Sequence, residues 1–162
     1  MTRIDFYVLP EGEDRREWFA CRITEKAYSH GHAVYLQAAD AAEAARLDGL
    51  LWTFRAGSFV PHRLAGDEAA APAGEPPVIV AWEGLADGEE PSRALAAQAE
   101  DAVLVTLTDE VPLFFSHFPR VVELVAGDER QRAAARARFR FYRDRGYSIQ
   151  THEVSATQLQ AD

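Results

Sequence analysis

Short apolar runs alternate with amphipathic segments along the first third of this 162-residue chain. Residues 4–9 form a mostly apolar run that ends at Pro10, which predicts a buried strand. Residues 14–30 and 40–53 repeat apolar side chains every three to four positions, as amphipathic helices do, and residues 33–36 form a second apolar run between them. This strand–helix–strand–helix order indicates a right-handed crossover and a parallel sheet.

The rest of the chain continues this alternation. Further strands are expected at 78–82, 102–107 and 121–125, an edge strand at 147–154, a short helix at 92–98, and a helical or turn segment at 109–119. We therefore predict one α/β domain over residues 1–154, in which helices flank a mostly parallel central sheet of about five strands, and a frayed tail over 155–162. The architecture is Rossmann-like without a phosphate-binding loop, because neither G-x-G-x-x-G nor G-x-x-x-x-G-K-[ST] occurs.

A basic helix is predicted within the segment DERQRAAARARFRFYRDRG, residues 128–146, which holds seven of the 17 Lys and Arg residues. Asp128 is a suitable N-cap, and Gln131 follows three residues later as in a capping box. Gly146 is a natural residue to follow the last turn, where arginines interact favourably with the helix dipole.

This helix has two different faces. At about 100° per residue, an arc of roughly 100° collects four arginines and one aromatic ring: Arg132, Arg136, Phe139, Arg140 and Arg143. The other side, which would face a core, collects Ala134, Ala135, Phe141 and Tyr142. Arg138 projects near the middle of this apolar side, so it has to reach an edge or find a partner.

The residues of the basic face are compatible with two interpretations. The first is a solvated helix face with an incidental Phe. The second is a pocket for an acidic ligand with a hydrophobic tip, because guanidinium groups match carboxylates and the ring supplies apolar area. Nucleic acid would also suit a basic face, but 26 Asp and Glu residues and a net charge of -9 would repel a polyanion over an extended footprint.

Aromatic residues also gather in a loop-like segment, residues 51–66, which contains Trp52, Phe59 and the pair Pro61–His62. These rings either pack beneath the edge of the sheet or form a protein-contact patch, since aromatic residues are enriched at the centres of interfaces. The following segment, residues 67–77, is rich in Ala, Pro, Gly and Glu, which predicts an exposed loop.

No catalytic or metal-binding motif occurs in the sequence: H-E-x-x-H, C-x-x-C and G-x-S-x-G are all missing. The single Cys21 excludes an internal disulfide, and its position in a predicted helix among apolar residues favours a buried thiol. We therefore expect no catalytic residue, no metal and no cofactor. No run of 18 apolar residues occurs, so we expect no membrane span, and the cysteine content is consistent with the cytoplasm.

Three stretches together resemble the chi subunit of the bacterial DNA polymerase III holoenzyme. They are DFYVL at residues 5–9, RLD through Trp52 to SFVPHRLAG at 46–66, and RARFRFYR with GY at 136–147. The resemblance implies a cytoplasmic accessory subunit without enzymatic activity of its own and with a fold close to the nucleotide-binding type. In this family, such a subunit links the clamp-loader complex, through the small psi subunit, to single-stranded DNA-binding protein, and contacts DNA only indirectly.

The resemblance further implies a site for the flexible acidic tail of single-stranded DNA-binding protein, which ends in Pro-Phe and a free carboxylate. By matching positions, Arg136 would bind the carboxylate, Val125 and Phe139 would line an apolar slot, and Arg132 and Arg140 would attract the acidic residues. The sequence has Phe139 where Tyr is common and Arg140 where Lys is usual. The charges are therefore kept, whereas a phenol hydroxyl is lost.

A second site is implied for the psi subunit, at the positions Trp52, Phe59, Pro61 and His62, with the Phe as the usual contact. Trp52 is alternatively a contributor to the tail site. Two other functions are left as alternatives. One is direct binding of single-stranded nucleic acid by the basic helix, and the other is an α/β enzyme that binds a nucleotide or small acid at the carboxyl edge of the sheet.

Overall fold

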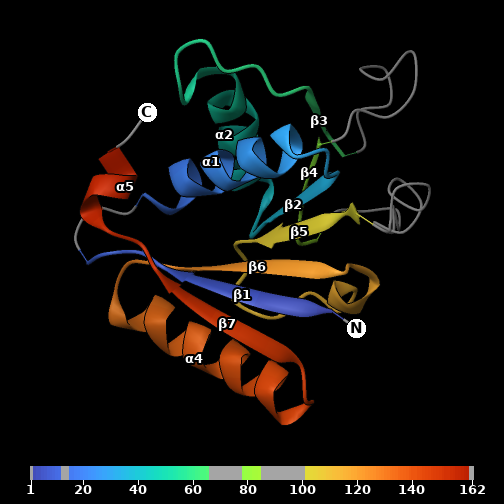
Figure 1. Cartoon of the computed structure of the whole chain (residues 1–162), viewed down its shortest axis with the longest axis vertical. Helices are drawn as coiled ribbons and strands as arrows, with labels where there is room; N and C mark the ends of the chain where they lie inside the picture. The colour runs from blue at the N-terminus through green and yellow to red at the C-terminus, as the bar shows by residue number, and fades with distance from the viewer. Residues whose placement is uncertain (1, 12–14, 66–77, 85–100, 161–162) are drawn as a thin grey trace.

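The computed structural model describes residues 2–11, 15–65, 78–84 and 101–160. The loop expected at 67–77 and the short helix expected at 92–98 lie outside these described residues. Within them, a single sheet of seven parallel strands runs through the molecule (Figure 1). In spatial order the strands are β3 (His62–Leu64), β4 (Val78–Trp82), β2 (Val34–Ala38), β5 (Val103–Thr106), β6 (Arg120–Val125), β1 (Arg3–Val8) and β7 (Ser148–Glu153).

The predicted α/β class with a parallel sheet is confirmed, but the count of about five strands is too low. The expected edge strand at 147–154 is present as β7. The strand β3 was not predicted, because His62 and Arg63 do not give the apolar alternation that identifies a strand. Arg63 is nevertheless buried, and the strand pairs with β4 at the opposite edge from β7.

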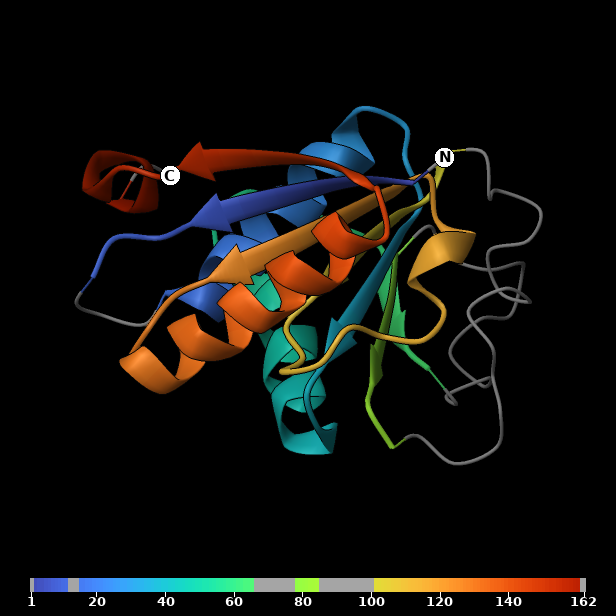
Figure 2. The ribbon, with the colours of Figure 1, turned by 90° about the horizontal axis from the view of Figure 1, so that it is seen from below.

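Helices cover both faces of the sheet. Figure 1 shows α1 (Arg16–Ser29) and α2 (Ala41–Thr53) on one face and α4 (Glu129–Asp144) on the other. Seen from below in Figure 2, α4 runs along the part of the sheet formed by β6, β1 and β7. A short 3-10 helix, η3 (Phe115–His117), precedes β6, and α5 (Ala156–Gln160) lies within the segment expected as a tail.

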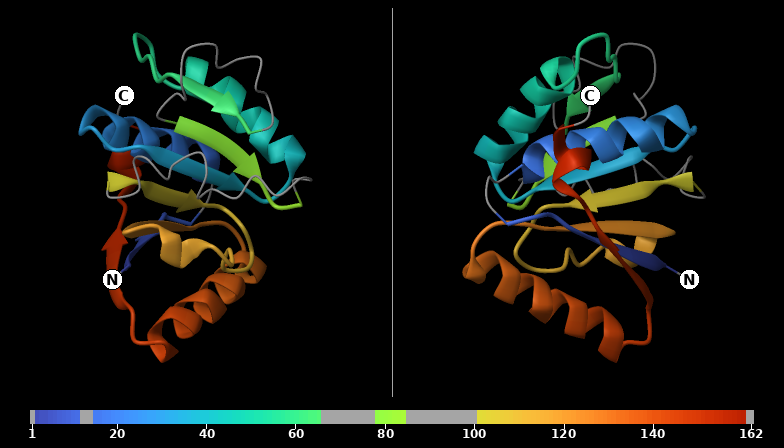
Figure 3. Two further views of the ribbon diagram at one scale, coloured as in Figure 1. Left: turned by 90° about the vertical axis from the view of Figure 1, so that its right-hand side faces the viewer. Right: turned by 60° about the vertical axis from the view of Figure 1, so that its left-hand side comes forward.

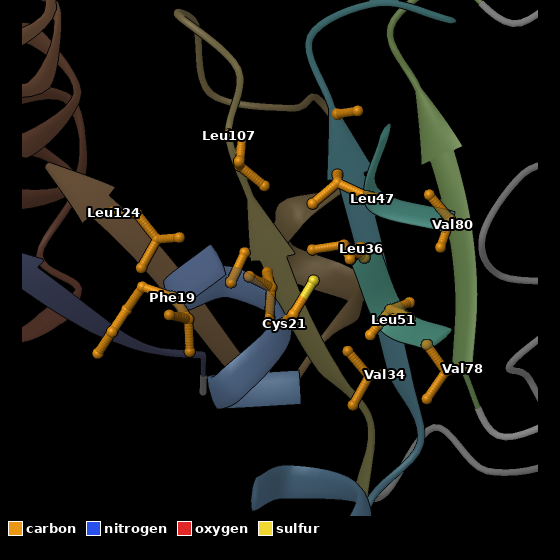
Figure 4. Close-up of a cluster of buried hydrophobic side chains, with 14 of the residues drawn as sticks. Phe19, Cys21, Val34, Leu36, Leu47, Leu51, Val78, Val80, Leu107 and Leu124 are labelled. Carbon is orange, nitrogen blue, oxygen red and sulfur yellow. The ribbon is translucent and has the colours of Figure 1, made fainter. Parts of the chain in front are cut away.

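Two apolar cores result from the alternation of side chains along the buried strands. The larger core lies between the sheet and the pair α1 and α2, and Figure 4 shows Phe19 and Cys21 of α1 and Leu47 and Leu51 of α2 among its side chains. The second core lies beneath α4, where Tyr142 is fully buried.

Asp128 and Gly146 cap the two ends of α4 as predicted, but the capping box is incomplete, because the shielded Gln131 Oε1 makes no hydrogen bond among the described residues. The Asp128 carboxylate accepts a hydrogen bond from the Gln131 backbone N–H at 3.0 Å. At the other end, Gly146 has a φ of +80°, and the Tyr147 N–H donates to the Tyr142 carbonyl at 3.1 Å. A residue in this left-handed conformation, with these bonds, forms a Schellman cap and stops the helix.

Arg138 finds its partner in the neighbouring strand. Its Nε donates to the Glu123 carboxylate on β6 at 2.8 Å, and the Tyr142 hydroxyl donates to the other carboxylate oxygen at 2.6 Å. Burial raises the pKa of the Glu123 carboxyl above its ordinary value, while the guanidinium and the hydroxyl act in the opposite direction. The ion pair holds α4 in one position on the sheet, with the basic face turned outward.

Candidate functional site

A groove with a volume of about 270 Å³ lies between α4 and the sheet. It is lined by Phe6, Val8, Val125, Arg132, Ala135, Arg136, Phe139 and Thr151. Apolar side chains of two strands and the helix form most of this lining, and two guanidinium groups of α4 complete it. The groove therefore combines an apolar surface with positive charge.

The parallel register of β1 and β6 determines which side chains form the floor of the groove. Val8 and Val125 are the last residues of β1 and β6, and they are paired across the two strands. Phe6 lies two residues before Val8 and so points to the same face of the sheet. Its ring centroid is 5.4 Å from that of Phe139, which is half-buried and leans onto the sheet from α4.

Arg132 is held at one side of the groove. It is half-buried, and its Nη2 donates to the Leu9 carbonyl, just after β1, at 3.3 Å. Its Nε is shielded from solvent and makes no hydrogen bond within the part of the chain that the structure describes. A shielded N–H without an acceptor is costly.

Arg136 stands one turn further along the same face and is mostly exposed, with its guanidinium paired to Glu129. Arg140 is also exposed, and among the described residues it makes neither a hydrogen bond nor an ion pair. It follows the groove along α4 but does not line it.

The structure thus brings together Val125, Arg132, Arg136 and Phe139 from the expected tail site. Sequence reasoning missed Phe6, Val8, Ala135 and Thr151. The first two could have been found, since alternate residues of β1 share a face. Thr151 could not, because its place depends on the parallel pairing of β7 with β1, a contact between opposite ends of the chain.

The aromatic residues at and just after the C-terminal end of α2 form a separate surface. Trp52 is 49% exposed and Phe59 is 67% exposed, with ring centroids 5.8 Å apart. His62 lies beneath Trp52 at 4.5 Å, and its Nε2 is 3.0 Å from the Asp48 carbonyl oxygen. Trp52 and Phe59 are therefore at the surface rather than packed beneath the sheet edge, whereas the His62 side chain is buried below them. We call Trp52, Phe59, Pro61 and His62 the aromatic patch.

The aromatic patch borders a larger hollow of about 1030 Å³ between α1 and the C-terminal end of β7. Phe59 contributes to its lining, together with Trp18 and Phe54, whose rings are 6.5 Å apart. Arg55 pairs with Glu25 in this wall at 2.7 Å. Aromatic side chains therefore continue from the patch toward α1, where Trp18 is half-buried and Phe54 is buried.

The groove and the aromatic patch lie on opposite sides of the molecule. The two side views of Figure 3 place α2 and α4 at opposite ends of the structure, and the sheet separates them. Trp52 does not line the groove. The two surfaces therefore do not overlap.

Other chemistry is not favoured by the described residues. Burial raises the pKa of the Cys21 thiol to about 12, so this group stays protonated at neutral pH and is a poor nucleophile. The described ranges contain no group of three or more His, Cys, Asp or Glu side chains arranged to hold a metal ion. Within the same ranges, every helix is too short or too polar to cross a membrane.

Comparison with known proteins gives consistent matches over almost the whole chain. The family model described as "DNA polymerase III chi subunit, HolC" matches residues 1–150. A protein named DNA polymerase III subunit chi from Pseudomonas aeruginosa is 43% identical over 155 residues, which cover 95% of this chain and 98% of the relative. Proteins of the same name from Escherichia coli and Haemophilus influenzae are 30% and 27% identical, over 93% and 92% of this chain and 97% and 95% of their own lengths.

Proposed function

The chain belongs to the DNA polymerase III chi subunit family, and from this premise we propose that it is a non-catalytic adaptor with two protein partners. The groove beneath α4 would bind the acidic C-terminal tail of single-stranded DNA-binding protein. The aromatic patch would bind the psi subunit of the clamp-loader complex. The observation that carries the proposal is the groove itself, where Arg132 and Arg136 border an apolar slot.

The groove has the chemistry that a tail ending in Pro-Phe and a free carboxylate requires. The terminal ring would enter between Phe139 and the strand residues Val8 and Val125, where burial of an aromatic side chain contributes about 1.5–3 kcal/mol. The carboxylate would pair with Arg136 at the rim, and a charge-assisted hydrogen bond contributes about 1.5–3 kcal/mol.

The acidic residues before the ring would lie along the basic face of α4. Arg132 brings a positive charge to the groove wall, and Arg140 offers a guanidinium that pairs with no described residue. Ordering a flexible tail costs free energy, so we expect a dissociation constant near 1 μM, or about -8 kcal/mol.

The aromatic patch supports the second contact. Exposed Trp and Phe rings side by side are unusual on a free surface and typical of the centre of a protein interface. The buried imidazole of His62 packs beneath the Trp52 ring and fixes its position at the surface, so this ring need not be ordered when a partner binds.

The tail site is tested by fluorescence polarisation with a labelled acidic peptide that ends in Pro-Phe, compared with the same peptide lacking the Phe. We expect micromolar binding that is lost with the Phe and weakened at least tenfold by Arg136→Ala. Arg143→Ala is the matched control, because this exposed arginine of α4 pairs with Asp144 and does not line the groove.

The control variant should bind like the wild type. Equal binding of both peptides, or equal loss in the two arginine variants, would mean that the basic helix attracts acidic peptides through its charge alone. In that event the groove is not a tail site.

A further inference from the structure

One of the two groove arginines is already paired within the chain. The Arg136 guanidinium forms an ion pair with the Glu129 carboxylate, two turns earlier on α4. Residues seven apart lie on nearly the same side of a helix, so Glu129 shares the row of Arg132 and Arg136. Arg132 is not part of this pair, because its guanidinium donates to the Leu9 carbonyl.

Both partners of the pair are accessible to solvent. The side chain of Arg136 is 57% exposed and that of Glu129 is 77% exposed. An exposed pair of this kind separates easily, because both charges are hydrated afterwards. The pair therefore occupies the Arg136 Nη2 donor, which a ligand carboxylate can take over from Glu129.

We propose that Glu129 is an internal competitor of the ligand carboxylate and so sets the affinity of the groove. This inference rests on the proposed tail-binding function. A Glu side chain presents the same chemical group as a free C-terminus, so both carboxylates compete for the Arg136 Nη2 donor that bonds Glu129. Binding of the tail through its terminal carboxylate thus exchanges one ion pair for another.

The exchange has a measurable consequence. Glu129→Gln removes the competing charge but keeps the length and helix propensity of the side chain. Since exposed ion pairs are weak, the tail peptide with a free carboxylate should bind about two- to fivefold more tightly to the variant than to the wild type.

The matched control is Asp144→Asn, which removes an equal charge from the other end of the same helix, where Asp144 pairs with Arg143. This variant should bind like the wild type. A peptide with an amidated C-terminus separates competition from general charge effects, because it has no carboxylate to exchange. The wild type and Glu129→Gln should bind it equally.

The Arg136→Ala background completes the test as a double-mutant cycle. Adding Glu129→Gln to Arg136→Ala should give no further gain in affinity. A gain that persists in this background or with the amidated peptide would overturn the inference, since it would reflect reduced repulsion alone. Tight binding by the wild type with no change in Glu129→Gln would also overturn it, while leaving the tail site intact. No binding by the wild type would overturn the proposed function and this inference together.

Discussion

Asp5 shows how a single residue fixes the edge of the sheet next to the groove. Its side chain is 1% exposed and accepts bonds from Arg120 at 2.8 Å and Arg3 at 3.2 Å through one oxygen. His152 of β7 donates to the other oxygen at 3.0 Å. The residue before this histidine, Thr151, lines the groove, so Asp5 also positions that wall.

The Asp5 cluster predicts a pH dependence of stability. Burial on its own raises the pKa of Asp5, but the hydrogen bonds from His152 and Arg120 and the charges of Arg120 and Arg3 outweigh it and hold the pKa below its ordinary value. With a lowered folded pKa, the unfolded chain binds more protons as the pH falls. The contribution of Asp5 is therefore present above an ordinary pKa of about 3.9 and is lost as the pH falls through the folded pKa.

Urea unfolding of the wild type and Asp5→Asn between pH 3 and pH 7 measures this contribution. The variant should be less stable at pH 7 by about 1.5–3 kcal/mol, because the charge-assisted hydrogen bonds to the carboxylate are lost and the arginines are hydrated by water instead. The difference should shrink toward pH 3. A difference that stays constant over this range would show that the cluster does not act through the charge of Asp5.

At the scale of elements, the position of α4 depends on the ion pair between Arg138 and Glu123. Both side chains are buried, at 7% and 0% exposure. Arg138→Leu would leave a buried carboxylate without its cation, which costs about 3–5 kcal/mol. Arg140→Leu, two residues later on the exposed side, should change stability by less than about 0.5 kcal/mol.

Thermal and urea unfolding of the two variants checks this contrast. Similar stabilities for Arg138→Leu and Arg140→Leu would contradict the assigned role of the pair. Arg140→Leu should instead weaken binding of the acidic tail peptide, so the two arginines separate stability from binding.

The same helix shows what the sequence could and could not reveal. Its bounds and exposed face follow from Asp128, Gly146 and the spacing of the arginines, all of which are local signals. The sequence also shows that Arg138 needs a partner. It does not show that this partner is Glu123, since the two meet only when β6 and α4 pack together.

The groove residues on α4 were mostly predictable from the sequence, whereas those on the strands were only partly so. Phe6 and Val8 could be read from the alternation of β1, whereas Thr151 depends on a strand pairing between the two ends of the chain. Strand β3 was missed for a related reason, because its three residues become a strand only by pairing with β4.

At the scale of the whole molecule, the sheet separates two different surfaces. The basic groove lies beneath α4 near the edge strand β7, and the aromatic patch lies at the C-terminal end of α2 near the other edge strand, β3. Figures 1 and 3 show α4 and α2 at opposite ends of the molecule. The chain has a net charge of -9, and seven of its 17 basic residues lie in or next to α4. Acidic ligands are therefore attracted to the basic face of α4 and repelled, on average, by the rest of the surface. Two unlike surfaces at the two ends of the molecule are consistent with the proposed adaptor role.

The most direct test of this account is a bridging measurement. The acidic tail peptide is immobilised, the chain is added, and retention of the psi subunit is recorded by surface plasmon resonance. The wild type should be retained and should then bind psi on the same surface. Arg136→Ala should not be retained, whereas Phe59→Ala should be retained but should fail to bind psi. Competition between psi and the peptide for the wild type, or loss of both partners in either variant, would contradict two independent surfaces.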